Sequence, residues 1–147
     1  MGKLAMLPAL AAALLAPSAL AADAARRETA VAAIPAPPAG MGQVVFYRSP
    51  NIGTLIGCRV HEDGEVVNRL PHGTYFIHPT TPGIHEYELK TDLLRVEVEE
   101  GETQYVRCRL IGAGWPDLSL RNRTDFERLV RALDLVPPWT GDKGTDD

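Results

Sequence analysis

Four histidines are the residues of this chain whose type most readily suggests chemistry: His61, His72, His78 and His85. A zinc or copper site needs three or four ligands that converge on one point. His78 and His85 flank one predicted turn, and His72 lies in the turn before it. No two of these histidines occupy positions that would face each other across a predicted hairpin. His61 and His85 are also expected on different faces of their strands. The pattern favours separate surface and strand-end histidines, and we expect neither a metal nor a cofactor.

Nucleophilic catalysis would need a serine or cysteine beside a histidine that a carboxylate orients. Beyond the N-terminal segment the serines are Ser49, in a turn, and Ser119, and neither lies in a G-x-S-x-G elbow. The two thiols, Cys58 and Cys108, are expected in the core. The sequence therefore predicts a protein that is not an enzyme.

Carboxylates are numerous, and a pair of them could suggest a glycosidase. They crowd the ends of two predicted strands, at Glu86, Glu88, Glu97, Glu99, Glu100 and Glu102. Acidic residues that alternate along a strand usually form the solvated face of a half-buried sheet. This interpretation is favoured over a catalytic pair.

Tyr47, Arg48 and Tyr75 are the candidate binding residues, with Tyr105 as a further tyrosine of the same kind. Tyrosine and arginine are enriched at recognition surfaces because they combine a large area with a polar tip. Aromatic residues are equally common in strands, where they fit the pleated surface. The second interpretation, a structural role, is favoured.

The two cysteines each lie on the apolar side of a predicted strand. Cys58 shares its face with Ile56 and Val60, and Cys108 shares its face with Val106. In an exported chain we expect Cys58 and Cys108 to form a disulfide, although two buried free thiols are the alternative.

The elements that carry these residues are short β-strands separated by turns. Strands are predicted over 43–48, 55–61, 65–70, 74–78, 84–90, 94–98 and 103–110. Asp63-Gly64 is a strong hairpin signal, and residues 94–98 alternate cleanly between apolar and charged. About seven strands at this spacing predict an all-β, antiparallel β-sandwich of immunoglobulin-like or prealbumin-like type.

One C-terminal amphipathic helix follows the strands. Thr124 to Glu127 fits a capping box, with Thr124 as the N-cap. The apolar residues recur at helical spacing and form one stripe, namely Phe126, Leu129, Val130 and Leu133. The stripe is expected to dock on the sheet domain.

The N-terminus has the features of a secretory signal. Lys3 precedes an apolar run that ends in Ala19-Leu-Ala21, a small-x-small cleavage pattern. We expect a signal peptide over 1–21, an Ala/Pro-rich, flexible or semi-extended linker over 22–40, the domain over 41–136 and a polar tail over 137–147. Cleavage near Ala21 would give a periplasmic or secreted protein without a stable membrane anchor. The net charge of −4, with scattered basic residues, argues against nucleic-acid binding.

The order of these strands and turns resembles domain-of-unknown-function family 2846, a group of small bacterial envelope proteins that includes many lipoproteins. The matching residues are Val44 to Arg48, Asp63-Gly64, Gly73 to Phe76, Pro82-Gly83 with His85, and Gly101 with Tyr105-Val106. The resemblance covers about half of the chain and implies an all-β module with no known reaction. The chain lacks the acylated cysteine of the lipoprotein members.

Together these features predict an exported, non-enzymatic module of the cell envelope whose partner is an envelope protein or a glycan. Two alternatives remain. One is a small periplasmic enzyme or metal-handling protein that uses the histidines, and the other is a structural accessory subunit whose helix packs on a partner.

Overall fold

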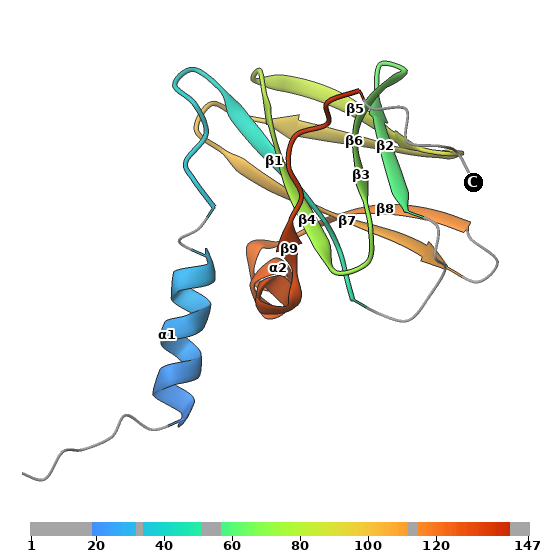
Figure 1. Cartoon of the computed structure of the whole chain (residues 1–147). Coiled ribbons are helices and arrows are strands. Elements are labelled where there is room, and N and C mark those ends of the chain that lie inside the picture. The colour runs from blue at the N-terminus through green and yellow to red at the C-terminus, as the bar shows by residue number, and fades with distance from the viewer. Residues whose placement is uncertain (1–18, 32–33, 51–56, 112–114, 142–147) are drawn as a thin grey trace, which may run out of the picture.

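The computed structural model describes residues 19–31, 34–50, 57–111 and 115–141 of the chain. Two β-sheets pack face to face, and a short helix covers the outer face of one of them (Figure 1). The strands are β1 (Gly42–Arg48), β2 (Cys58–Glu62), β3 (Glu65–Leu70), β4 (Thr74–Thr80), β5 (Gly83–Leu89), β6 (Asp92–Val98), β7 (Thr103–Ile111), β8 (Trp115–Arg121) and β9 (Asp134–Leu135). The predicted β-sandwich is confirmed.

The sheets divide the strands into five and four. Sheet A has the order β8-β7-β1-β4-β9, and sheet B has the order β3-β2-β5-β6. The seven predicted strands correspond to β1–β7, and the structure adds β8 and β9. Sheet A departs from a purely antiparallel arrangement because β1 pairs parallel with β7 and β4 pairs parallel with β9. The immunoglobulin-like or prealbumin-like subtype stays a prediction.

The main core lies between the sheets and is centred on aromatic rings. Phe46 stacks on Phe76 at a centroid distance of 4.9 Å, and the edge of Tyr87 meets Phe46 at 4.9 Å. A disulfide joins Cys58 of β2 to Cys108 of β7, with Cα atoms 6.6 Å apart, so it links the two sheets directly. The predicted pairing is confirmed. A disulfide of this kind indicates an oxidising, extracellular compartment.

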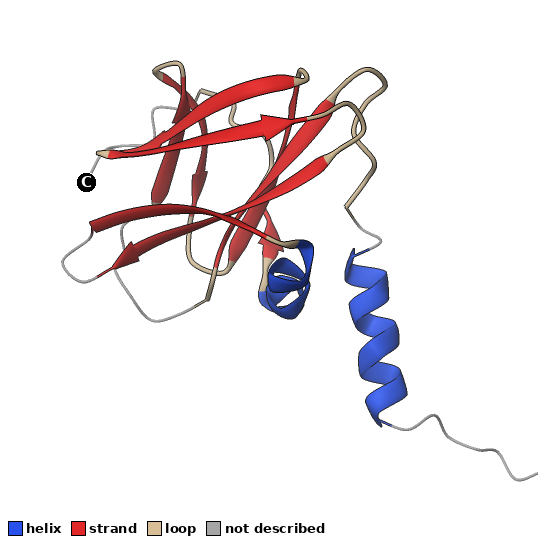
Figure 2. Cartoon of the chain, turned by 180° about the vertical axis from the view of Figure 1, so that it is seen from behind, coloured by secondary structure: helices blue, strands red, loops and turns tan. Residues whose placement is uncertain are grey.

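A second core lies on the other face of sheet A, under α2 (Arg123–Leu129) and the 3₁₀ helix η1 (Val130–Ala132). Figure 2, in which the molecule is viewed from behind, shows α2 lying against the sheet. Phe126 is fully buried, and its ring meets the rings of Tyr47, Tyr75 and Tyr105 at 5.2–5.5 Å. The predicted docking of the apolar stripe is confirmed: Phe126, Val130 and Leu133 are buried, and Leu129 is partly buried.

The helix begins two residues earlier than the capping-box prediction. Asn122 is the N-cap, and its side-chain oxygen accepts a hydrogen bond from the backbone N–H of Asp125 at 2.9 Å. The prediction of Thr124 as the cap was therefore wrong. Asparagine is among the best N-cap residues, so its position three residues before Asp125 is a competing local signal.

The segment before the sandwich differs from the predicted extended linker. Residues Ala19–Val31 form helix α1, which projects away from the sheets in Figure 1. Arg131 of η1 forms an ion pair with Asp23 of this helix. Residues 34–41 run along the domain, and Ile34 packs against the second core.

The two ends of the chain are described only in part. The predicted signal peptide falls mainly on residues outside the described ranges, as does the end of the predicted polar tail. The tail begins attached to the domain, because the Pro137 carbonyl accepts a hydrogen bond from the Asn68 side chain at 3.0 Å. No helix within the described ranges is long and apolar enough to cross a membrane.

Candidate functional site

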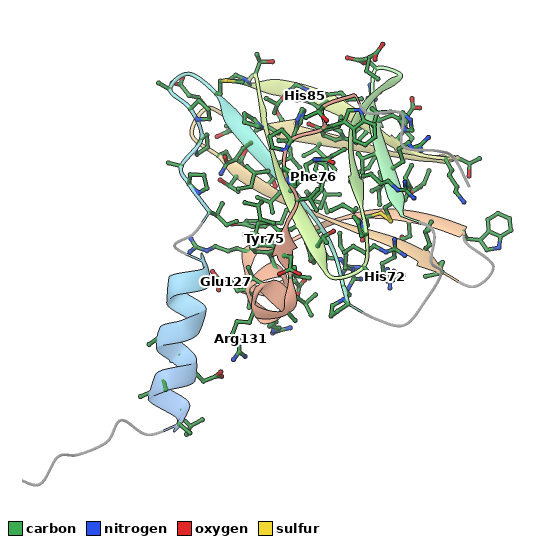
Figure 3. The ribbon with its side chains drawn as sticks, viewed as in Figure 1. His72, Tyr75, Phe76, His85, Glu127 and Arg131 are labelled. Carbon is green, nitrogen blue, oxygen red and sulfur yellow. A yellow bond between two sulfur atoms is a disulfide. The ribbon has the colours of Figure 1, made fainter. Side chains whose placement is uncertain are left out.

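The three binding candidates lie inside the molecule. Tyr47 is fully buried and Tyr75 is 7 % exposed, both under α2 in the second core (Figure 3 labels Tyr75). Arg48 is 4 % exposed, and it donates to the Leu70 carbonyl at 3.2 Å and to the His72 ring at 3.1 Å. Burial lowers the pKa of Arg48. None of the three offers an accessible recognition surface, which agrees with their favoured structural interpretation.

Two histidines that the sequence placed apart share one carboxylate. Glu62, at the end of β2, bonds His78 Nε2 through one oxygen at 2.8 Å and His85 Nδ1 through the other at 2.7 Å. The interpretation as surface and strand-end histidines did not include this shared carboxylate. The turn between β4 and β5 brings the two rings together, and β2 supplies the carboxylate because it pairs with β5.

This group, which we call the Glu62 clasp, joins the two sheets. His78 belongs to β4 of sheet A, whereas Glu62 and His85 belong to sheet B. His85 Nε2 also lies 2.7 Å from the Thr81 carbonyl, which can only accept. Each ring nitrogen of His85 thus lies beside an acceptor oxygen, Nδ1 beside the Glu62 carboxylate and Nε2 beside this carbonyl. The buried Tyr87 ring stacks on His85 at 6.2 Å.

The clasp lies on the far side of the sandwich from α2, as the labels of His85 and Glu127 in Figure 3 show. A small hollow of about 270 Å³ adjoins it, lined by Glu62, Asp63, Ile84, His85, Glu86 and Arg95. In the part of the chain that the structure describes, no group of three or more His, Cys, Asp or Glu residues is arranged to hold a metal ion. The observed contacts of the clasp are those of an inter-sheet connection.

A larger hollow of about 550 Å³ opens where the 34–37 segment passes the junction of β8 and α2. We call it the Arg121 hollow. Its lining consists of residues 34–37 on one segment, Gly101 and Thr103 to Tyr105, and Arg121, Asn122 and Arg123. Its volume lies in the range of small-molecule sites.

The apolar wall of this hollow is held in place by one buried side chain. Gln43 of β1 is 1 % exposed, and its amide nitrogen donates to the Pro35 carbonyl at 2.7 Å and to the Thr103 hydroxyl at 3.0 Å. The prolines Pro35 and Pro37 restrict the backbone of the same segment. The predicted linker thus supplies a fixed wall of the hollow.

Cations gather beside the hollow, on the outer face of β7 and β8 and on α2, and most of them are paired. Arg109 bonds Asp117 at 2.7 Å, Arg123 bonds Glu127 at 2.5 Å, and Arg128 lies 3.4 Å from Asp125. Arg107 and Arg121 differ: within the described ranges neither forms a hydrogen bond or an ion pair.

The unpaired arginines belong to a group of buried polar atoms without partners. Arg107 of β7 lies opposite Tyr47 of β1 on one side and opposite Ser119 of β8 on the other. Arg121 comes two residues after Ser119 and therefore lies on the same face of β8. Tyr47 Oη, Arg107 Nε, Ser119 Oγ and Arg121 Nε are all buried and have no hydrogen-bond partner in the described structure. Leaving one such group unsatisfied costs about 1–3 kcal/mol.

The electrostatics of this face agree with the geometry. The pKa of Arg107 is lowered, first by burial and then by the neighbouring charges of Arg109 and Arg121. Burial likewise raises the pKa of Tyr47, against a smaller opposing effect of Arg107. Tyr47 and Asp117 oppose the lowering of the Arg107 pKa, so burial is the main cause of both shifts.

Sequence reasoning missed Arg107, Arg121 and Ser119 as candidates. Arg107 and Arg109 alternate with apolar residues along β7 and looked like a solvated face. Which arginine meets a carboxylate depends on the register between β7 and β8, and β8 itself was not predicted. The available signal was the excess of arginine over acid in residues 105–123.

Comparison with models of protein families, with curated proteins and with solved structures found no match to this chain. The functional interpretation therefore rests on the geometry of the described residues.

Proposed function

We propose that this protein is an exported, non-enzymatic β-sandwich module of the cell envelope that binds an envelope protein or glycan at the Arg121 hollow. The observation that supports this proposal most directly is the pairing of a preformed hollow with an unpartnered cation, Arg121, on its wall. Binding sites commonly combine such a concave surface with a few polar groups. Cleavage near Ala21 and membership of domain-of-unknown-function family 2846 belong to the same proposal.

The chemistry of the lining supports binding. The hollow is lined by apolar, amide and guanidinium groups with a threonine and a tyrosine, and its described lining includes no histidine, cysteine or carboxylate. Such groups hold and orient a ligand, whereas acid–base catalysis most often uses a histidine or a carboxylate.

The two alternative functions find less support. The accessory-subunit hypothesis needs a free apolar helix face, but Phe126, Val130 and Leu133 are buried within the domain itself. The histidine-based hypothesis needs convergent ligands, whereas His78 and His85 are engaged in the Glu62 clasp.

Photo-crosslinking in the native cell tests the proposed surface. A benzophenone amino acid replaces Ala36, which is exposed on the wall of the hollow, and in a control it replaces Leu93, exposed on β6 of the opposite sheet. We expect one discrete adduct with an envelope protein or glycan from position 36 and none from position 93. The absence of an adduct at position 36, or equal adducts at both positions, would contradict the proposal.

A further inference from the structure

We propose that Arg121, together with Arg107, binds an oxyanion, such as a carboxylate, carried by the ligand of the Arg121 hollow. The inference rests on the proposed function and specifies the chemistry of the ligand. It starts from the contrast between two sets of arginines on one face of the molecule.

The first step is the distribution of charge. Each of Arg109, Arg123 and Arg128 is matched by a carboxylate of its own. Arg107 and Arg121 have no such partner among the described residues, although they lie on neighbouring strands of the same face. A ligand that carries a negative charge would give Arg107 and Arg121 the kind of partner that the other three arginines already have.

The second step is the type of atom that is missing. Arg107 Nε and Arg121 Nε can only donate, and the hydroxyls of Ser119 and Tyr47 can donate as well. The site therefore offers several donors and needs an acceptor with several lone pairs. A carboxylate or phosphate oxygen pair meets this need, because the guanidinium fork binds such a group through two parallel hydrogen bonds.

The third step is access. Arg121 lines the hollow, so a ligand there meets its guanidinium group first, and the apolar 34–37 wall contacts the rest of the ligand. The Nε atoms of Arg107 and Arg121 are covered by neighbouring side chains in the free protein. We expect the two guanidinium groups to reorient toward the oxyanion when it binds, and their Nε–H signals to report this movement.

The test is a titration of the disulfide-bonded, full-length mature protein followed through the arginine Nε–H resonances by nuclear magnetic resonance. The probes are glucuronate, acetyl-glutamate amide and inorganic phosphate, with glucose as the neutral analogue of glucuronate. We expect saturable shifts of the Arg107 and Arg121 signals with at least one oxyanion. Arg109 and Arg95, whose Nε atoms already bond Asp117 and Glu86 outside the hollow, are the internal controls and should stay unchanged.

Four variants make the test specific. Arg107→Gln and Arg121→Gln should each weaken oxyanion binding by about tenfold or more, because each removes a charged donor fork. Arg95→Gln, on the opposite sheet and 72 % exposed, should have no effect. Dispersed spectra of the variants establish that they are folded, and Arg121→Lys, which keeps the charge but loses the fork, should give intermediate binding.

The outcomes separate this inference from the proposed function. Tighter binding of glucuronate indicates a sugar as the source of the oxyanion, and tighter binding of acetyl-glutamate amide indicates a peptide. Glucose that binds as tightly as glucuronate, or shifts of all arginine signals alike, would overturn the oxyanion site. The adduct at position 36 would be unaffected by that result, and its absence, or an equal adduct at position 93, is what contradicts the proposed function.

Discussion

At the scale of single residues, the position least tolerant of change is Gly42, where β1 begins. A Cβ atom at Gly42 would lie 2.5 Å from the backbone oxygen of Glu99 and would also collide with Val98 Cγ1. A backbone oxygen in a β-turn cannot move aside as a side chain can. The sequence is glycine here because β1 passes directly against the end of β6.

Gly42→Ala should therefore lower the free energy of unfolding by about 1–3 kcal/mol, as overpacking of a filled site does. Urea denaturation measures the effect. Gly57→Ala is the matched control, because the added Cβ would meet only the side chain of Arg69, which can shift. Equal stability of the two variants would show that the turn around Glu99 yields to the new methyl group.

At the scale of elements, the start of α2 is set by one hydrogen bond. The Asn122 side chain satisfies the Asp125 N–H, whereas Thr124 lies within the helix. Asn122→Ala should cost about 1 kcal/mol of stability because an N-cap is lost. Thr124→Ala should change stability by less than about 0.5 kcal/mol, the usual range of a surface substitution. Thermal unfolding compares the two, and a larger loss in Thr124→Ala would restore Thr124 as the cap.

Strand alternation and turn residues were sufficient to predict β1 to β7, because these signals are local. β8 escaped prediction since Pro116 interrupts it, and a proline is tolerated there because β8 is an edge strand of sheet A. The continuous apolar run of Val44 to Tyr47 is buried on both faces, because α2 covers the face of β1 that points away from the main core. The parallel pairing of β1 with β7 depends on long-range packing that no local pattern encodes.

The candidate site was harder to predict than the fold. The Glu62 clasp and the Arg107–Arg121 pair join residues from different strands, so each depends on the strand order and register. Burial of Tyr47 and Tyr75 depends on the helix that covers their face. Residue types alone offered arginine and tyrosine as binding candidates, but at Tyr47, Arg48 and Tyr75, which are buried, and not at Arg107 and Arg121.

At the scale of the whole molecule, the Cys58–Cys108 disulfide connects the sheets across a loop of 50 residues. Loop-closure entropy gives an upper figure of about 4 kcal/mol, and observed losses on removal start at about 2 kcal/mol. Cys58→Ala/Cys108→Ala should lose stability in this range in urea denaturation. Adding a reductant should destabilise the wild-type protein similarly and leave the double variant unchanged. Two reactive thiols in the denatured, unreduced protein would contradict the pairing.

The four tyrosines of the chain make the stability of the folded protein depend on pH in the alkaline range. Burial raises the pKa of Tyr47, Tyr75, Tyr87 and Tyr105 above the ordinary value of about 10. For Tyr87 the negative charge of Glu62 adds to this effect, and the nearby Thr80 side chain opposes it.

Since the folded state disfavours the phenolate, the stability that these groups contribute is complete below pH 10. It is lost as the pH rises above 10, where the unfolded chain ionises and the folded chain does not. Phenolate absorbance and far-ultraviolet circular dichroism should therefore change together in one alkaline transition. Tyr87→Phe removes one ionising group and should make the loss of stability above pH 10 less steep. Phenolate that forms near pH 10 while the circular dichroism stays native would show that the tyrosine rings are accessible in the folded protein.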